Sequence, residues 1–321
     1  MVGENRMENL ILAMNVVLPI LIILTIGYVL KYFNMVDSHS LNKMNSLVFR
    51  VFMSSLLFIN IYRLDAEAVF QLKNLRFILF PVLGVFCMIF LSYLVYSRTI
   101  KDSKKCSVMI QAAYRGNFVL FGIPIASTLY GEEALGITSL LLAAVIPTFN
   151  LTAILLLEFY RGEKIKLSKL VSSTYKNPLL LASTLAIICL LLDIHIPNIL
   201  EVTISSLAKV ATPLAFIVLG GSLEMKSVKK HWKYLLTANI VKLLVFPFFL
   251  IVASHFLSFT SMEITAFLAA TACPAAVASF TMAKEMDADG DLAGEIVVTT
   301  SAFSIVTIFF WVLILKNIAW I

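Results

Sequence analysis

Apolar residues run through this chain in stretches that are long enough to cross a lipid bilayer, and short polar segments separate the stretches. A transmembrane helix needs about twenty predominantly apolar residues. Counted at that length, the pattern predicts ten helical spans. They cover roughly residues 10–31, 40–60, 75–97, 106–130, 134–159, 177–193, 199–222, 232–254, 262–283 and 294–316. The sequence therefore predicts an all-α membrane protein with ten transmembrane helices.

The fourth and ninth spans are interrupted about ten residues after they begin. Residues 112–117 read Ala-Ala-Tyr-Arg-Gly-Asn, and residues 270–275 read Ala-Thr-Ala-Cys-Pro-Ala. Gly116 and Pro274 both weaken a helix, glycine through its conformational freedom and proline through its missing N–H group. We therefore expect two discontinuous helices whose breaks meet near the middle of the membrane. Interrupted spans at corresponding positions of two halves are the best pointer in a sequence to a carrier's binding site.

The two halves of the chain are weakly similar to each other at a nearly constant offset of 158 or 159 residues. The matched pairs include Pro19 with Pro178, Leu56 with Leu214, Gly116 with Pro274, Val119 with Val277, and Gly131 with Gly290. This pattern predicts a duplication, with repeat one over about residues 10–160 and repeat two over about residues 177–317. Each repeat holds five spans, and because five is odd the second repeat enters the membrane from the opposite side. Inverted repeats allow alternating access, since either half can rock against the other.

Composition agrees with a membrane protein and excludes a water-soluble one. Hydrophobic residues make up 60% of the chain and charged residues 14%, with a mean hydropathy of +0.95, whereas soluble domains carry about 25% charged residues. No polar linker is long enough to separate two domains, so residues 1–321 are interpreted as a single membrane transport domain. The first apolar run is too long for a signal peptide and is expected to stay as a span. The four cysteines lack metal-binding spacing, and neither a metal nor another cofactor is predicted.

The positive residues between the spans fall mainly on one side of the membrane. With the N-terminus outside, five Lys and Arg residues lie in outer segments, namely Arg6, Arg63, Lys73, Arg76 and Lys316. Sixteen lie in inner loops, namely Lys31, Lys43, Arg98, Lys101, Lys104, Lys105, Arg161, Lys164, Lys166, Lys169, Lys176, Lys226, Lys229, Lys230, Lys233 and Lys284. Cytoplasmic loops carry an excess of Lys and Arg, so both termini are predicted to be extracytoplasmic in a multi-pass protein of the cytoplasmic membrane. The net charge of +6 then reflects this bias and contact with anionic lipid, and does not indicate nucleic-acid binding.

The breaks supply groups that suit an anionic ligand. A broken helix exposes backbone groups that must be satisfied in the membrane, and half-helix N-termini carry partial positive charge. Asn117 adds an amide that can donate to a carboxylate. Four cations lie inside the spans, and the sequence places no carboxylate comparably deep; they are Arg50, Arg115, Lys209 and Lys242. Arg115 adjoins a break and is a candidate ligand for an anion. The alternative for all four is contact with backbone carbonyls or extension to the membrane surface.

At these residues the sequence resembles the auxin efflux carrier family, which includes plant auxin exporters and bacterial permeases for small organic acids such as malonate and malate. The stretch Arg115-Gly116-Asn117-Phe118-Val119-Leu120-Phe121-Gly122-Ile123-Pro124 is similar to the fourth-helix motif of the bacterial members. Pro274 followed by Ala283-Lys284-Glu285 resembles the ninth-helix motif, and Asn177-Pro178-Leu179 and Leu219-Gly220 resemble the sixth and seventh spans. The resemblance covers nearly the whole chain and is strongest to the bacterial organic-acid branch.

The resemblance implies ten helices in two inverted five-helix repeats, a scaffold part and a transport part, and a substrate beside the crossing of the fourth and ninth helices. It implies that Asn117 contacts the substrate, that Gly116 and Pro274 form the breaks, and that Met53 faces the pocket. The predicted substrate-binding residues are Asn117, Arg115, Gly116, Pro274, Ala275, Met53 and Val277. Gly116 stands where plant members have proline, and Ser54 stands where members commonly have proline, which disfavours auxin itself as the substrate.

The function predicted from the sequence is secondary transport of a small organic anion, a mono- or dicarboxylate, by alternating access. One alternative is a sodium-coupled symporter of similar architecture, for which Ser279, Thr281 and backbone carbonyls are the available oxygen ligands. A membrane-embedded enzyme is a second alternative, disfavoured because no cluster of Asp, Glu or His is visible. Expected partners are the organic anion and membrane lipid, without nucleic acid. The oligomeric state stays open between a monomer and a homodimer.

Overall fold

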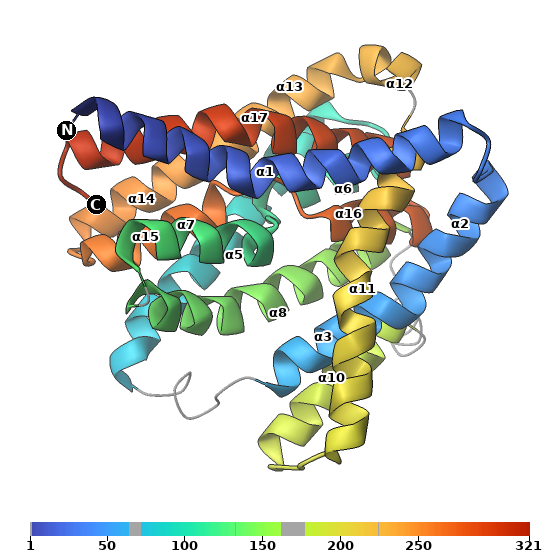
Figure 1. Cartoon of the computed structure of the whole chain (residues 1–321), viewed down its shortest axis with the longest axis horizontal. Helices are drawn as coiled ribbons and strands as arrows, with labels where there is room; N and C mark the ends of the chain where they lie inside the picture. The colour runs from blue at the N-terminus through green and yellow to red at the C-terminus, as the bar shows by residue number, and fades with distance from the viewer. Residues whose placement is uncertain (1, 64–71, 132, 162–176, 224) are drawn as a thin grey trace.

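The computed structural model of the chain describes residues 2–63, 72–131, 133–161, 177–223 and 225–321. All regular secondary structure in these residues is helical (Figure 1). Six helices are long and apolar enough to cross a membrane: Ser38–Tyr62, Asn74–Thr99, Gly136–Arg161, Asn198–Ser222, Trp232–Phe256 and Gly290–Asn317. The prediction of an all-α chain with several membrane-spanning helices is confirmed at this level. The basic loop predicted after Arg161, with Lys164, Lys166, Lys169 and Lys176, lies outside the described residues.

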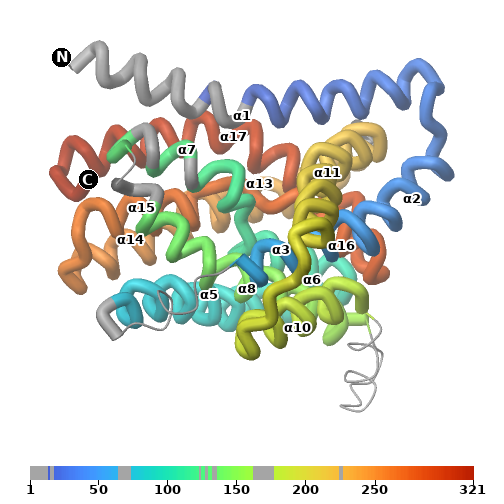
Figure 2. The backbone as a smooth tube through the Cα atoms, turned by 60° about the horizontal axis from the view of Figure 1, so that its bottom comes forward, coloured from blue at the N-terminus to red at the C-terminus, as the bar shows by residue number. Residues whose placement is uncertain are grey.

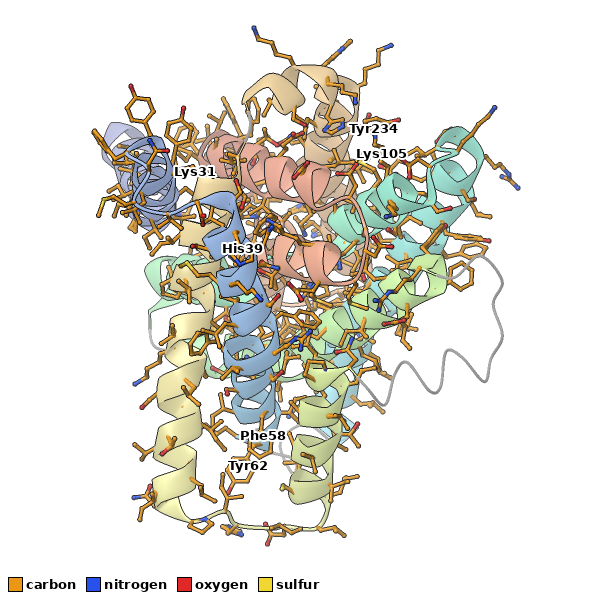
Figure 3. All side chains as sticks on the ribbon, turned by 90° about the vertical axis from the view of Figure 1, so that its right-hand side faces the viewer. Lys31, His39, Phe58, Tyr62, Lys105 and Tyr234 are labelled. Atoms are coloured by element: carbon orange, nitrogen blue, oxygen red, sulfur yellow. The ribbon has the colours of Figure 1, made fainter. Side chains whose placement is uncertain are left out.

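A first helix group surrounds α11. Its members are α1 (Val2–Tyr32), α2 (Ser38–Leu47), the π-helix η1 (Val48–Phe52), α3 (Met53–Tyr62), α10 (Pro178–Leu191) and α11 (Asn198–Ser222). Helix α3 packs against α10 and α11, which lie beside it at the lower right of Figure 1, and α1 packs along α11. At the far end of α3, the Tyr62 hydroxyl accepts a 3.1 Å hydrogen bond from the N–H of Ile196, and the Tyr62 ring stacks on Phe58 (Figure 3).

The remaining helices form a second helix group. They are α5 (Leu72–Thr99), α6 (Ser103–Tyr114), α7 (Phe118–Tyr130), α8 (Glu133–Arg161), α12 (Met225–Lys230), α13 (Trp232–Ile240), the π-helix η2 (Val241–Val245), α14 (Phe246–Phe256), α15 (Ser261–Thr271), α16 (Val277–Glu285) and α17 (Gly290–Asn317). Helix α5 packs along α6 and α8, α7 along α15, and α16 along α17. Helix α1 also packs on α17, as the upper edge of Figure 2 shows, and so links the two groups.

Local sequence explains where α6, α15 and α10 begin. Asp102 caps α6 by accepting from the N–H groups of Lys104 and Lys105. Thr260 and Glu263 form a reciprocal capping box at the start of α15, which satisfies two otherwise unpaired N–H groups. Asn177 caps α10, whose next residue is a proline at the position where the helix needs no N–H donor.

The two predicted interruptions lie where the sequence places them. Helix α6 ends at Tyr114 and α7 begins at Phe118, while α15 ends at Thr271 and α16 begins at Val277. Pro124 lies inside α7 and does not end it. Each half-helix is too short to cross a membrane alone, which is one reason why six helices satisfy the length criterion where ten spans are predicted. The first and sixth predicted spans contain shorter apolar helices, Leu18–Tyr32 and Pro178–Leu191.

Two long helices contain a π-helical turn that the sequence pattern did not predict. The turn η1 lies between α2 and α3 and carries Arg50, and η2 lies between α13 and α14 and carries Lys242. The indole N–H of Trp311 on α17 donates to the carbonyl of Leu243 at 2.9 Å and so holds η2 in place. Single π-turns inside α-helices occur frequently at functional sites, and both turns here present a cation.

Candidate functional site

The two helix breaks contact each other through their backbones. Gly116 and Ala275 form an isolated antiparallel β-bridge, and the N–H of Asn117 donates to the carbonyl of Pro274 at 2.8 Å. The N–H of Ala275 donates to the Thr300 hydroxyl on α17 at 3.1 Å. These bonds satisfy backbone groups that each cost several kcal/mol when left unpaired away from water. The bridged residues are separated by the larger of the two repeat offsets, so corresponding points of the two halves meet at the crossing.

The close approach of the two helix breaks bears on the glycine at position 116. A Cβ atom built there would lie 2.3 Å from the Cys273 sulfur and 2.9 Å from the Lys242 ammonium nitrogen. Both distances are shorter than real Cβ contacts, so a side chain at this position would have to move the Cys273 thiol and the Lys242 ammonium. The nearest backbone atom, the Ala270 carbonyl oxygen, would lie 3.3 Å away. Gly116 therefore suits the crossing, in addition to its weakening effect on the helix.

A cavity of about 100 Å³ lies at the start of α7 and α16. One water molecule needs about 10–15 Å³ by a comparable measure, so the cavity has room for a small organic molecule. It is lined by Met53, Leu56, Leu57, Asn60, Arg115, Gly116, Asn117, Phe118, Val119, Ile146, Phe149, Asn150, Leu179, Thr212, Ala276, Val277, Ala278 and Met282. These residues come from α3, α10 and α11 of the first helix group and from α7, α8 and α16 of the second. The cavity thus lies between the two groups.

Five of the seven predicted site residues line this cavity. They are Met53, Arg115, Gly116, Asn117 and Val277. Pro274 and Ala275 are buried in the second break, where they pair with the first break, and they are not among the lining residues. Ala276, Asn150 and Thr212 also line the cavity, and sequence reasoning did not select them. Their side chains reach it from α8, α11 and the second break, and sequence spacing alone does not show that these elements converge.

Arg115 is buried beside the cavity. Its side chain is 3% exposed, and its guanidinium donates to the Asn150 amide oxygen at 2.6 Å and to the Met282 sulfur at 2.7 Å. A thioether is a weak acceptor, so one edge of the guanidinium is poorly satisfied. Within the described residues no carboxylate forms an ion pair with Arg115. A buried cation in this state suits an anionic ligand.

At the crossing, the positive and the negative ends of the helix dipoles have different surroundings. The first residues of α7 and α16 border the cavity, and their N–H groups carry the positive end of each helix dipole. The last carbonyls of α6 and α15, which carry the negative ends, accept hydrogen bonds from the Lys242 ammonium. Lys242 is fully buried, and its contact with backbone carbonyls is the alternative that the sequence analysis kept open.

The other two intramembrane cations are exposed. Lys209 lies on the surface of α11, and Arg50 borders a second cavity of about 480 Å³. This vestibule, as we name it, is lined by Phe49, Arg50, Glu158, Arg161, Asn177, Pro178, Glu285 and Met286. It lies about one helical turn from the first cavity along α16 and along the continuous η1–α3 helix, and about two to three turns along α8. The two cavities therefore succeed each other between the same elements.

One buried acid was missed by the sequence analysis, which placed no carboxylate deep in the spans. Glu295 on α17 is 2% exposed, and its carboxylate contacts the ring of His231, also buried, at 2.8 Å. His231 is the residue that joins α12 to α13. Both residues fall near predicted span ends, and only the packing of α13 on α17 buries them together. Among the described residues, no group of His, Cys, Asp and Glu could hold a metal ion.

The helical architecture and the cavity between two helix groups define a membrane transport protein. The sequence matches the family described as membrane transport protein over residues 12–312, and the chain belongs to this family. It is similar to an uncharacterised transporter of Methanocaldococcus jannaschii, with 26% identity over 95% of this chain and 99% of the relative. A second uncharacterised transporter, from Methanothermobacter thermautotrophicus, is 25% identical over 93% of this chain and 97% of the relative. Family and relatives indicate a multi-pass transporter rather than an enzyme.

Proposed function

We propose that this protein is a secondary carrier for a small organic anion, a mono- or dicarboxylate, and that it works by alternating access. The observation that carries the proposal is the cavity at the crossing, where a buried arginine that has no acidic partner among the described residues lies beside two half-helix N-termini. The family membership supports transport, and the bacterial organic-acid branch is our extension of it.

The proposed binding mode places the carboxylate on Arg115, on the amide of Asn117 and at the N-terminal ends of α7 and α16. A bidentate Arg–carboxylate contact is stronger than a neutral hydrogen bond, and it would replace the weak contact with the Met282 sulfur. The apolar part of the substrate would contact apolar lining residues such as Met53 and Phe149. The cavity volume favours a compact acid over a large amphipathic molecule.

The proposed architecture is ten spans in two inverted repeats, with broken fourth and ninth helices. The bridge between Gly116 and Ala275 supports it, because these residues are related by the repeat offset. The first helix group would serve as the scaffold and the second as the moving part, since the cavity lies between them and Asn117 belongs to the second group. The vestibule would connect the site with the side that carries most of the cations.

The experiment that tests the function is a thermal-shift screen of the purified protein against mono- and dicarboxylates, with malonate and malate as first probes. We expect at least one carboxylate to raise the melting temperature through preferential binding to the folded state. Arg115→Gln should then weaken binding of malonate by roughly tenfold or more, since a hydrogen bond to a charged group contributes about 1.5–3 kcal/mol. The neutral diamide of malonate should be affected much less.

Two controls make the outcome specific. Lys209→Gln removes an exposed intramembrane cation outside the cavity and should leave malonate binding unchanged. Arg115→Lys should restore binding only in part, because an ammonium cannot reproduce the planar fork of arginine. An equal loss for malonate and its diamide in Arg115→Gln would contradict the anion site. A screen in which no carboxylate stabilises the protein would contradict the substrate class.

A further inference from the structure

The position of Lys242 bears on how the carrier is coupled. Its ammonium donates to the carbonyl of Tyr114 at 3.2 Å and to the carbonyl of Thr271 at 3.0 Å. Tyr114 is the last residue of α6, and Thr271 is the last residue of α15. One side chain therefore closes the C-terminal ends of both helices that stop at the crossing.

These helix ends form a cation site of a recognisable kind. The last carbonyls of a helix have no intrahelical donors, and they carry the negative end of the helix dipole. In carriers built from broken helices, unwound carbonyls and half-helix C-terminal ends hold the coupling cation. Here the ammonium occupies that position, with its charge fully buried and with the Phe246 ring 5.6 Å away.

The surrounding structure is shaped to place the ammonium there. The π-turn η2 carries Lys242, and the Trp311 hydrogen bond to Leu243 fixes that turn. Gly116 leaves the space, since a Cβ atom at that position would lie 2.9 Å from the ammonium nitrogen. In the described part of the chain, no carboxylate pairs with Lys242. Its charge is therefore balanced by the two helix ends, not by an acid.

We propose that Lys242 is a tethered cation, which fills the place that a free monovalent metal ion would otherwise take at the crossing. At these two helix ends the carrier then needs no sodium ion, because the ammonium takes the carbonyl oxygens that a sodium ion would bind there. This inference rests on the proposed carrier function, because it concerns the coupling of that function. Lys242 is a positioning residue: it fixes the two half-helix ends and does not line the substrate cavity.

The test removes the tether and asks whether a free cation replaces it. Lys242→Ser leaves space and a hydroxyl oxygen, whereas Lys242→Met fills the space without a charge. The melting temperatures of wild type and variants are compared in sodium chloride and in choline chloride at equal ionic strength, without any organic ligand. Lys209→Ser is the matched control, since it removes an exposed lysine from the membrane part of α11.

We expect the wild type to melt at the same temperature in both salts. Lys242→Ser should melt lower in choline and recover by about 2 °C or more as sodium saturates the vacated position, because a ligand of the folded state raises its stability. Lys242→Met and Lys209→Ser should show no sodium effect. A Lys242→Ser protein that is indifferent to sodium, or a sodium effect of equal size in Lys209→Ser, would overturn the proposal.

A second measurement uses only the wild type and so does not depend on whether the variants fold. Binding of radioactive sodium to the purified protein should be absent at the crossing, and stoichiometric saturable binding would contradict the tethered cation. Neither experiment contains a carboxylate. Failure of the malonate experiments would therefore reject the substrate, while failure of the sodium experiments would reject the role of Lys242.

Discussion

At the scale of single residues, the crossing keeps the positive ends of two helix dipoles apart from the negative ends of two others, and different side chains lie at each. Arg115 and Asn117 lie where α7 and α16 begin, and Lys242 lies where α6 and α15 end. Arg115 and Asn117 could be predicted because they adjoin the break in the sequence. The contacts of Lys242 could not, since its two carbonyl acceptors lie 128 and 29 positions away in the chain. Only the folded structure brings them together.

The amide of Asn117 provides the first prediction at this scale. The described residues give its side chain no hydrogen-bond partner, although it borders the cavity and its backbone N–H is bound to Pro274. Asn117→Ala should therefore weaken malonate binding by roughly tenfold or more, the size expected for one hydrogen bond to a carboxylate. Its melting temperature without ligand should stay close to that of wild type, and calorimetric titration measures the affinity.

A matched control exists for this substitution. Asn239 is also an intramembrane asparagine, but its amide donates to Thr299 on α17 at 3.0 Å and lies away from the cavity. Asn239→Ala should lower the melting temperature and keep the malonate affinity. Near-normal affinity in Asn117→Ala would remove that residue from the site.

At the scale of helices and turns, some features follow from sequence and others need packing. The breaks at Gly116 and Pro274 could be predicted because glycine and proline weaken a helix. The π-turns η1 and η2 could not, because their sequences, four apolar residues and one cation each, are as compatible with an ordinary α-helix as the residues on either side. The buried pair of His231 and Glu295 was missed because each residue stands near a span end. The packing of α13 on α17 converts two apparent surface residues into one buried contact.

The pair of His231 and Glu295 provides the prediction at this scale. His231→Leu removes the ring partner and leaves a buried carboxylate, one of whose oxygens already lacks a hydrogen bond in the described structure. Leaving a buried hydrogen-bonding group without its partner costs about 1–3 kcal/mol, and more for a charged group, so this variant should melt below wild type. Glu295→Gln should be milder, because it removes the carboxylate charge and keeps the shape.

The double variant distinguishes a pair from two separate effects. His231→Leu combined with Glu295→Leu leaves no unpaired carboxylate, and replacing both partners by apolar groups can be nearly neutral. The double variant should therefore melt higher than His231→Leu alone. Additive losses in the double variant would show that the two residues stabilise the protein independently.

At the scale of the whole molecule, the cations predicted for the inner side of the membrane and those predicted for the outer side contact different partners. Of the inner set, Lys104 pairs with Asp287 at 2.7 Å, Lys284 donates to Ser222, and Arg161 borders the vestibule. The Lys104 ammonium also lowers the pKa of the Asp287 carboxyl through this hydrogen bond. Lys105, another of this set, lies over the ring of Tyr234 (Figure 3).

The outer set makes its contacts elsewhere. Arg63 pairs with Glu201 at the start of α11, and Arg76 lies over the ring of Phe259. The start of α1 and the end of α17 lie near each other at the left of Figure 1. Two termini on one side of the membrane would give this arrangement, and the direction stays a prediction from the charge count.

The orientation is the last prediction, and it belongs to the molecule as a whole. Because sixteen of the loop cations fall on one side, a reporter fused after Ile321 should be extracytoplasmic. A cysteine at Lys229, exposed on α12, should react with an impermeant maleimide only after the membrane is opened. A cysteine at Arg63, exposed at the end of α3, should react in intact cells and is the matched control. The native cysteines are replaced by serine beforehand, since Cys87 is exposed. Labelling of Lys229→Cys in intact cells, with protection of Arg63→Cys, would reverse the orientation, and the vestibule would then open to the outside.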